Sequence, residues 1–340
     1  MSELKKKFAL PGGASVNKPL ISKMIELYTN KRYLFRDDVE ICAVYDAFFG
    51  VWNGGRVIEP ETQSDKYIRS ILEFYNSRGI PFRQIFTNFY AKYYLDDPQC
   101  NNIMRHINMN RMNECVVACD HTLSYLKEHY PNVRYFSSCT KVLLDTELVV
   151  NEHKKDYDGV CLWIDMNKES VIKAIPEHLR DKTEILCCQG CKTGCPYVYH
   201  AYHRWSIANL KLYGKDVKYP SFTMNCHIWQ PHTAEEMINL PTSLKHEQLD
   251  EFVKLGVNMF KITGRQSALG TFEMVKLFAY YLIKPECFEE YLSEYSNYIQ
   301  KLRDTRENTA TNGLYVGMGQ HPEVVYNTLE KEFADNVQNY

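Results

Sequence analysis

Residues 184–205 read EILCCQGCKTGCPYVYHAYHRW and place four cysteines between an apolar strand and a helical run. Cys188, Cys191 and Cys195 follow one another as CxxC and CxxxC, spacings that let thiolates from one turn reach a single inorganic centre. If the strand extends to residue 188, Cys187 points away from Cys188, because neighbouring strand residues face opposite sides. Only one of that pair is therefore expected to be a ligand.

Three thiolates need a fourth ligand. Cys226, in the segment SFTMNCHIW, is the first candidate, because it closes a β-rich segment that would reach the same end of a parallel sheet. Cys100 is the reserve candidate, because it lies near the start of a helix expected over 96–109, where a helix N-terminus would stabilise a thiolate. The sequence leaves open whether Cys187, Cys188 or Cys100 completes the site. Such soft ligands suit an iron-sulfur cluster or zinc.

The chain carries no segment typical of secretion or of a membrane span. Its start, MSELKKKFALPGG, has no apolar core of secretory length, and no later stretch approaches the ~18 apolar residues of a spanning helix. We expect a cytoplasmic protein without a membrane partner, in which clustered cysteines favour a metal over disulfides. The isolated cysteines are expected to be small buried hydrophobes: Cys42, Cys115, Cys119, Cys139 and Cys161.

Length and charge bound the fold and the partners. A chain of 340 residues with 45% hydrophobic content can bury a full core. Its net charge of −2 gives no broad electrostatic surface for nucleic acid. The expected partner is therefore a small-molecule or modified-polymer substrate, and a homo- or hetero-oligomer is possible.

Apolar strands and amphipathic helices alternate along the chain, which favours a parallel sheet covered by helices. Eight or nine such repeats predict a (β/α)8 TIM-like barrel over residues 1–284, with a helical extension over 285–340. A doubly wound open sheet is the alternative, but its nucleotide-binding turn is missing. Strands are expected at 7–10, 39–45, 82–88, 114–120, 134–140, 157–166, 183–188, 221–226 and 257–262.

Two cations near residue 260 predict an anion site. Lys261 lies between Phe260 and Ile262 in a strand, where an unpaired charge is costly, so a bound anion or an internal carboxylate is expected. Strand alternation puts Lys261 and Arg265 on one face, and an arginine fork beside a lysine suits a carboxylate or a phosphate. The competing interpretation is a structural ion pair with Glu184 or Asp165. Asp165, like Asp120 and Asn167, is expected to start a turn or cap a helix.

Two segments resemble a known family. The run QGCKTGCPYVYHAY over 189–202, followed by LGVNMFKITGR over 255–265, is similar to the collagenase-like peptidase superfamily, whose members carry a Gly-Cys-x3-Cys-Pro segment and a Phe-Lys-Ile-Glu-Gly-Arg-like strand. The resemblance implies a barrel with a 4Fe-4S cluster on Cys188, Cys191, Cys195 and Cys226. It also implies oxygen-independent hydroxylation of tRNA, ribosomal RNA or the ubiquinone ring.

The sequence departs from that family at several positions. The arginine and histidine of the CPFRxxHY pattern are replaced by Val198 and Ala201, although His203 and Arg204 follow on the same helix. Thr263 stands where the family strand has an acidic residue. These departures concern the substrate and leave the thiolate cluster unchanged.

Three function classes follow. The first is an iron-sulfur enzyme for hydroxylation or a related group transfer on a substrate with an anionic group. Its predicted catalytic residues are Lys261, Arg265, His203 and Asn88, the last at the carboxyl end of the third strand. The second is a peptidase, although neither HExxH nor GxSxG is present. The third is a non-catalytic, zinc-stabilised subunit of a heteromer.

Overall fold

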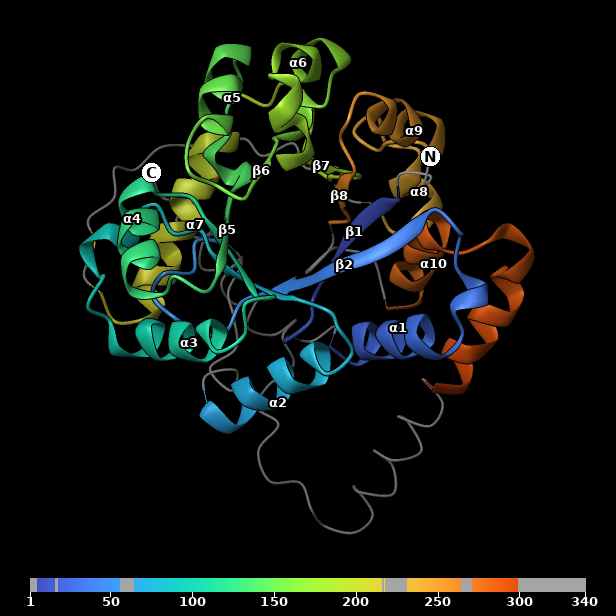
Figure 1. Ribbon diagram of the computed structural model, residues 1–340, viewed down its shortest axis with the longest axis horizontal. Helices are drawn as coiled ribbons and strands as arrows, with labels where there is room; N and C mark the ends of the chain where they lie inside the picture. The colour runs from blue at the N-terminus through green and yellow to red at the C-terminus, as the bar shows by residue number, and fades with distance from the viewer. Residues whose placement is uncertain are drawn as a thin grey trace, which may run out of the picture.

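Eight parallel strands close into a barrel in chain order, β1 to β8, with helices around the outside (Figure 1). The computed structural model describes residues 5–15, 18–55, 64–215, 217, 231–263 and 271–298. The closure is made by β8, which pairs in parallel with both β7 and β1. The predicted (β/α)8 barrel is confirmed.

The strands are β1 (Lys6–Pro11), β2 (Val39–Asp46), β3 (Phe82–Phe86), β4 (Glu114–Val117), β5 (Arg134–Ser137), β6 (Gly159–Cys161), β7 (Thr183–Leu186) and β8 (Met259–Lys261). The α-helices are α1 (Lys18–Asn30), α2 (Asp65–Asn76), α3 (Pro98–Asn108), α4 (Asp120–His129), α5 (Thr146–His153), α6 (Glu169–Ala174), α7 (Val198–Leu212), α8 (Ala234–Ile238), α9 (His246–Lys254) and α10 (Thr271–Leu282).

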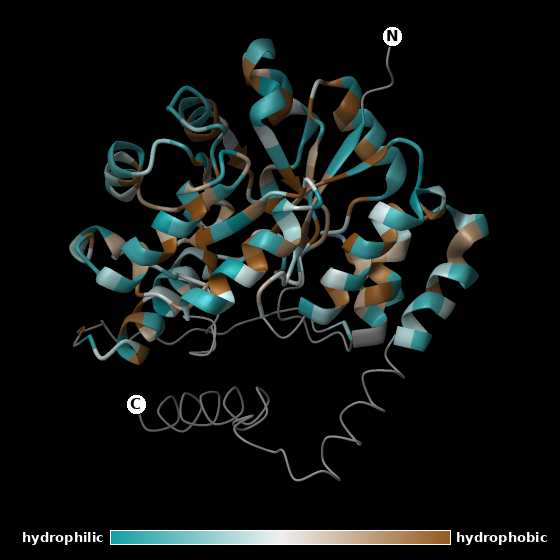
Figure 2. Cartoon of the chain, turned by 60° about the horizontal axis from the view of Figure 1, so that its bottom comes forward, coloured by the Kyte–Doolittle hydropathy of each residue, from teal (hydrophilic) through white to brown (hydrophobic). Residues whose placement is uncertain are grey.

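The outer helices form where apolar residues recur at helical spacing, and α2, α3, α5 and α8 begin at a capping side chain. In α2 the Ser64 hydroxyl accepts the Tyr67 N–H at the N-terminus, and the residues that face the barrel are Ile68, Ile71, Leu72 and Tyr75. Figure 2 shows hydrophilic and hydrophobic residues mixed along these helices. In α2 one face covers the sheet, whereas α10 is buried over most of its surface.

Several strands are shorter than the sequence predicts. The strand expected over 157–166 is only β6, Gly159–Cys161, and it is followed by the 3-10 helix η5, Ile164–Met166. The strand expected over 134–140 ends at Ser137 and passes into a second 3-10 helix, η4, Cys139–Lys141. Helix α5 was not predicted, and its start is capped by Asp145, whose carboxylate accepts the N–H groups of Glu147 and Leu148. The long apolar runs of the sequence thus continue past the barrel into its mouth.

Two apolar layers build the core. The larger lies between the strands and the helices. A smaller cluster fills the interior of the barrel, and it contains Ala9, Ala43, Tyr45, Ala47, Ile85, Val116 and Phe136. Residues that alternate along one strand, such as Ile85 and Phe86 of β3, enter the interior and the outer layer respectively.

A buried ion cluster crosses the barrel interior below its mouth. The Arg83 guanidinium lies 2.5 Å from Glu114 on the neighbouring strand β4 and also pairs with Glu184 on β7. All three side chains are at most 2% exposed. Because β3 and β7 are not neighbours in the sheet, the Arg83–Glu184 pair must span the interior. The guanidinium carbon also lies 4.0 Å from the centroid of the Phe136 ring.

The chain after the barrel begins as a helix that packs back onto it. Residues 288–298 are helical, and the buried Tyr291 and Tyr295 hydroxyls donate to the Val275 and Leu20 carbonyls, at 3.2 and 3.0 Å. The rest of the predicted 285–340 extension lies outside the described residues. Within the described part of the chain, no helix combines the length and apolar character needed to cross a bilayer.

Arg83→Gln should lower the free energy of unfolding by about 3–5 kcal/mol, because it leaves Glu114 and Glu184 buried without their shared cation. Urea denaturation at neutral pH measures the loss. Arg134→Gln is the matched control, because Arg134 pairs with the same Glu114 but its side chain is 49% exposed, so the loss should stay below about 1 kcal/mol.

The difference in unfolding free energy between wild type and Arg83→Gln should depend on pH. Although burial opposes its ionisation, Arg83 and Lys261 hold the pKa of Glu184 below its ordinary value of 4.5. The stabilisation from this ion pair is therefore complete above that pH and is lost as the pH falls through the lowered pKa. The stability gap between wild type and Arg83→Gln should narrow in acid, and a gap independent of pH would contradict this account.

Candidate functional site

Lys261 ends β8 with its ammonium group at the interior of the barrel. Its side chain is buried, with 7% of the residue exposed, and Nζ lies 4.3 Å from the centroid of the Tyr45 ring. The Tyr45 hydroxyl is held by the Ile262 carbonyl at 2.8 Å, so the ring is fixed beneath the ammonium group. Among the described residues no carboxylate forms an ion pair with Lys261, because Glu184 is bound by Arg83 instead.

The carboxyl ends of β5, β6 and β7 meet helix α7 in one apolar group, which we call the mouth cluster. Its buried members are Val142, Cys161, Trp163, Ile164, Leu186, Val198 and Tyr202. Partly buried side chains pack against it: Phe89, Cys139, Cys191, Cys195 and Trp205. This end of a (β/α)8 barrel is where enzymes of this fold place their active sites.

The loop that carries Cys191 and Cys195 is fastened to the end of β6 by Asp165. One carboxylate oxygen accepts the Gly194 N–H at 3.0 Å and the Trp163 indole N–H at 3.1 Å. Gly194 has φ +67, a left-handed conformation that glycine adopts without a steric penalty. Asp165 therefore positions the cysteine loop, which goes beyond the turn or cap role expected for it.

The predicted metal ligands are only partly brought together. Cys191 and Cys195 share the mouth cluster, whereas Cys187 and Cys188 are fully buried in the outer core between the strands and the helices. The Cys188 thiol lies 3.6 Å from the Thr263 hydroxyl, and burial raises its pKa. Within the described residues no three Cys, His, Asp or Glu side chains are grouped to hold a metal ion. Cys226 and Arg265 lie outside the described residues, so the four-cysteine site stays a prediction.

The expectation that the start of α3 stabilises a Cys100 thiolate is wrong. Cys100 is fully buried, and burial raises its pKa well above the usual range. Its sulfur accepts the Trp52 N–H at 3.4 Å, so it packs the β2–α2 loop against α3. The desolvation of the thiolate outweighs the favourable helix terminus.

Asn88 connects three segments beside the mouth. Its amide nitrogen donates to the Asn53 and Ser206 carbonyls at 2.9 Å each and lies 3.3 Å from the Val51 carbonyl. A side chain on Gly54 would strike the neighbouring backbone at Thr87, so this loop requires glycine there. What the structure shows for Asn88 is a tie between the end of β3, the β2–α2 loop and α7. Its predicted catalytic role stays a prediction.

His203 lies on α7 against the segment that follows β3. Its ring stacks on Phe89 with centroids 4.2 Å apart, and its Nδ1 is 3.1 Å from the Tyr90 hydroxyl. Burial and the nearby His200 lower its pKa, so the ring is neutral at physiological pH. Phe89, on which the His203 ring stacks, itself packs against the mouth cluster.

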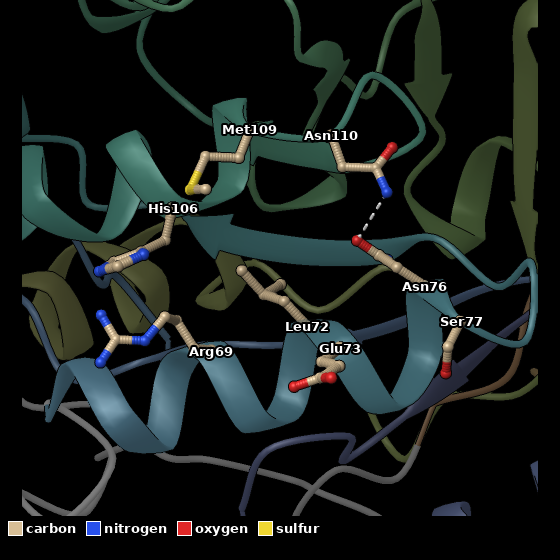
Figure 3. Close-up of a pocket in the computed structure, with 8 residues that line it drawn as sticks. All are labelled: Arg69, Leu72, Glu73, Asn76, Ser77, His106, Met109 and Asn110. Atoms are coloured by element: carbon tan, nitrogen blue, oxygen red, sulfur yellow. Dashed lines mark hydrogen bonds between the residues drawn. The ribbon is translucent and has the colours of Figure 1, made fainter.

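A pocket lies on the outside of the barrel. It has a volume of about 430 Å³ and lies between α2 and the end of α3 (Figure 3). Arg69 and Glu73 come from α2 and His106 from α3, while the Asn110 amide donates to Asn76 at 3.1 Å across it. None of the predicted site residues lines this pocket.

The structure adds site residues that the sequence analysis missed. Arg83 binds Glu184, the carboxylate expected as a possible partner of Lys261, and Cys139 and Cys161 reach the mouth cluster. Arg83 lies between Phe82 and Gln84 in a buried strand. As for Lys261, an unpaired charge there is costly, so a partner of opposite charge is expected. The cysteines gave no such signal, because an isolated cysteine in an apolar run is usually core.

Asp165→Ala should loosen the cysteine loop, because the Gly194 and Trp163 N–H groups lose a charged acceptor. Such hydrogen bonds contribute about 1.5–3 kcal/mol, so alkylation of Cys191 and Cys195 by iodoacetamide should become about tenfold faster or more. Mass spectrometry of the labelled peptides measures the rates. Glu169→Ala on exposed α6 is the control and should leave both rates unchanged.

The comparisons with known proteins found one similar structure. No family model matches this sequence, and no curated protein matches it. The solved structure of the U32 peptidase Mk0906 is similar to this chain with a TM-score of 0.47 and 10% identity. The alignment covers 78% of this chain and 96% of that one. A likeness of this degree carries no conclusion about activity, so the function is argued from the residues of the site.

Proposed function

We propose that this protein is a barrel enzyme that binds an anionic substrate at Lys261 and uses an iron-sulfur cluster held by the cysteine loop. The observation that carries the proposal is the buried Lys261 ammonium at the end of β8, with which no described carboxylate forms a direct ion pair, although the charge of Glu184 is near enough to interact with it. A buried charge without a partner is costly, and a substrate carboxylate or phosphate would remove that cost.

The chemistry of the thiols supports a cluster, and so does the position of Cys191 and Cys195. Cys191 and Cys195 are half-buried on the mouth cluster, at the end of the barrel that Lys261 faces. Cys188 and Cys226 would supply the other two ligands by the sequence prediction. As described, Cys188 lies in the outer core, so it would have to move to join them. A 4Fe-4S cluster bound there would supply redox or Lewis-acid chemistry for hydroxylation or a related group transfer.

The residues of this chain supply binding and orientation. Lys261 attracts the anionic group of the substrate, and the fixed Tyr45 ring holds the ammonium group in place. Trp163 and Tyr202, whose rings meet edge to face at 5.9 Å, form part of the apolar cluster on which Cys191 and Cys195 pack. Arg83 binds Glu184, so this carboxylate forms no direct ion pair with Lys261.

Replacing either Cys191 or Cys195 with alanine should abolish most iron and sulfide binding after anaerobic reconstitution, because each removes one thiolate ligand. Iron, sulfide and zinc analysis with visible absorption measures the content. Cys287→Ala is the control, since Cys287 lies in the 3-10 helix after α10. Tight zinc without iron in the wild type would support the zinc-stabilised subunit instead, and full cluster content in both variants would overturn the ligand assignment.

Lys261→Met should weaken the binding of inorganic phosphate or citrate by about 10- to 100-fold, since a hydrogen bond to a charged group contributes about 1.5–3 kcal/mol. Calorimetric titration measures the affinity, and urea denaturation measures stability in parallel. Lys173→Met is the control, because Lys173 is an exposed surface residue of α6. A strongly destabilised Lys261→Met protein with unchanged anion affinity would show that Lys261 is structural.

A further inference from the structure

Two cysteines outside the predicted ligand set meet at the mouth of the barrel. Cys161 is the last residue of β6, and Cys139 begins η4 directly after the neighbouring strand β5. The register that pairs Ser137 with Val160 brings the two chains together at this point. Cys161 is a buried member of the mouth cluster, and Cys139 packs against the same cluster.

The two thiols differ in access. Cys139 is half-buried, whereas Cys161 is 4% exposed. The hydrogen bond from Cys161 and the nearby Lys261 ammonium lower the pKa of Cys139, although burial opposes this. Burial and the contact with Cys139 raise the pKa of Cys161. One thiol is thus partly accessible and the other is sheltered, an arrangement that suits attack by Cys139 followed by resolution by Cys161.

We propose that Cys139 and Cys161 form a redox-active dithiol that a low-molecular-weight disulfide, such as glutathione disulfide, converts into an intramolecular disulfide. The proposal goes beyond the proposed function, because it concerns thiols that the cluster does not use. It assigns the barrel mouth a second kind of chemistry, with a disulfide as the oxidant.

The reaction proceeds in two exchange steps. The Cys139 thiolate attacks one sulfur of glutathione disulfide, the sulfur–sulfur bond of the oxidant breaks, and one glutathione thiolate leaves. The Cys161 sulfur then attacks the Cys139 sulfur of the mixed disulfide and displaces the second glutathione. The two thiol protons end on the two glutathiones. The protein loses two electrons, and glutathione disulfide gains them.

Other cysteine pairs are less suited to this exchange. Cys187 and Cys188 are adjacent in the chain, but both are fully buried and burial raises the pKa of each. Cys100 and Cys115 are likewise fully buried with raised pKa values. Cys191 and Cys195 share the mouth cluster, so they are the competing partners for Cys139 that an experiment must separate.

Peptide mapping of the metal-free, fully reduced protein tests the proposal. The protein is treated with glutathione disulfide, the remaining thiols are alkylated, and the trypsin digest is analysed without reduction. Trypsin releases Cys139 in peptide 135–141 and Cys161 in peptide 156–168. We expect these two peptides joined, lighter by two hydrogen atoms than their sum, and separated again by a reductant.

Single substitutions assign the order of the two steps. Cys161→Ser should stop at the mixed disulfide, with glutathione retained on Cys139, and Cys139→Ser should leave Cys161 unmodified. Cys287→Ser is the matched control for a half-buried thiol elsewhere and should keep the cross-link. The cross-link itself is tested on the wild-type protein. The proposal therefore stays testable even if either variant fails to fold.

Two results would overturn the inference: peptides 135–141 and 156–168 that remain linear at complete thiol consumption, or Cys139 joined to Cys191 or Cys195 instead. The proposed function fails separately. A wild-type protein that forms the Cys139–Cys161 cross-link but binds neither iron nor sulfide keeps the dithiol and loses the cluster. A protein that binds the cluster but forms no such cross-link supports the proposed function and contradicts the dithiol.

Discussion

The ion pair between Arg83 and Glu184 is the interaction on which the interior of this barrel depends. Arg83 reaches from β3 across the interior to β7 and also binds Glu114 on β4, so one guanidinium joins both sides of the barrel. The charges are buried, which makes their desolvation expensive, and only the close pairing of all three offsets that cost. A small apolar cluster packs around them, and the Phe136 ring covers the guanidinium.

This pairing also decides the charge at the mouth. Glu184 and Lys261 both lie in the interior, and the sequence alone allows them to neutralise one another. Because Arg83 takes Glu184, no described carboxylate pairs with the Lys261 ammonium, which rests on the Tyr45 ring. Lys261 therefore interacts with the charge of Glu184 without a direct ion pair between them.

The mouth concentrates thiols in a way that local sequence does not indicate. Cys139 begins η4 after β5 and Cys161 ends β6, while Cys191 and Cys195 come from a loop that Asp165 holds at the end of β6. Their isolation in the sequence favoured the interpretation of Cys139 and Cys161 as core residues. Asp165 likewise has the sequence context of a turn residue. Only the structure shows that its carboxylate accepts the backbone N–H of Gly194.

The sequence by itself determined that strands and helices alternate, and this alternation predicted the barrel. Helices and buried strands can be recognised locally because each has its own pattern of apolar residues. It also marked Lys261 as a charge that needs a partner, and the same reasoning extends to Arg83. Only the tertiary structure decided which carboxylate each cation meets, that Cys188 lies apart from Cys191, and that Cys139 meets Cys161. The physical reason is that strand periodicity fixes the face on which a side chain lies, whereas its partner depends on strand register and barrel closure, which join residues far apart in the chain.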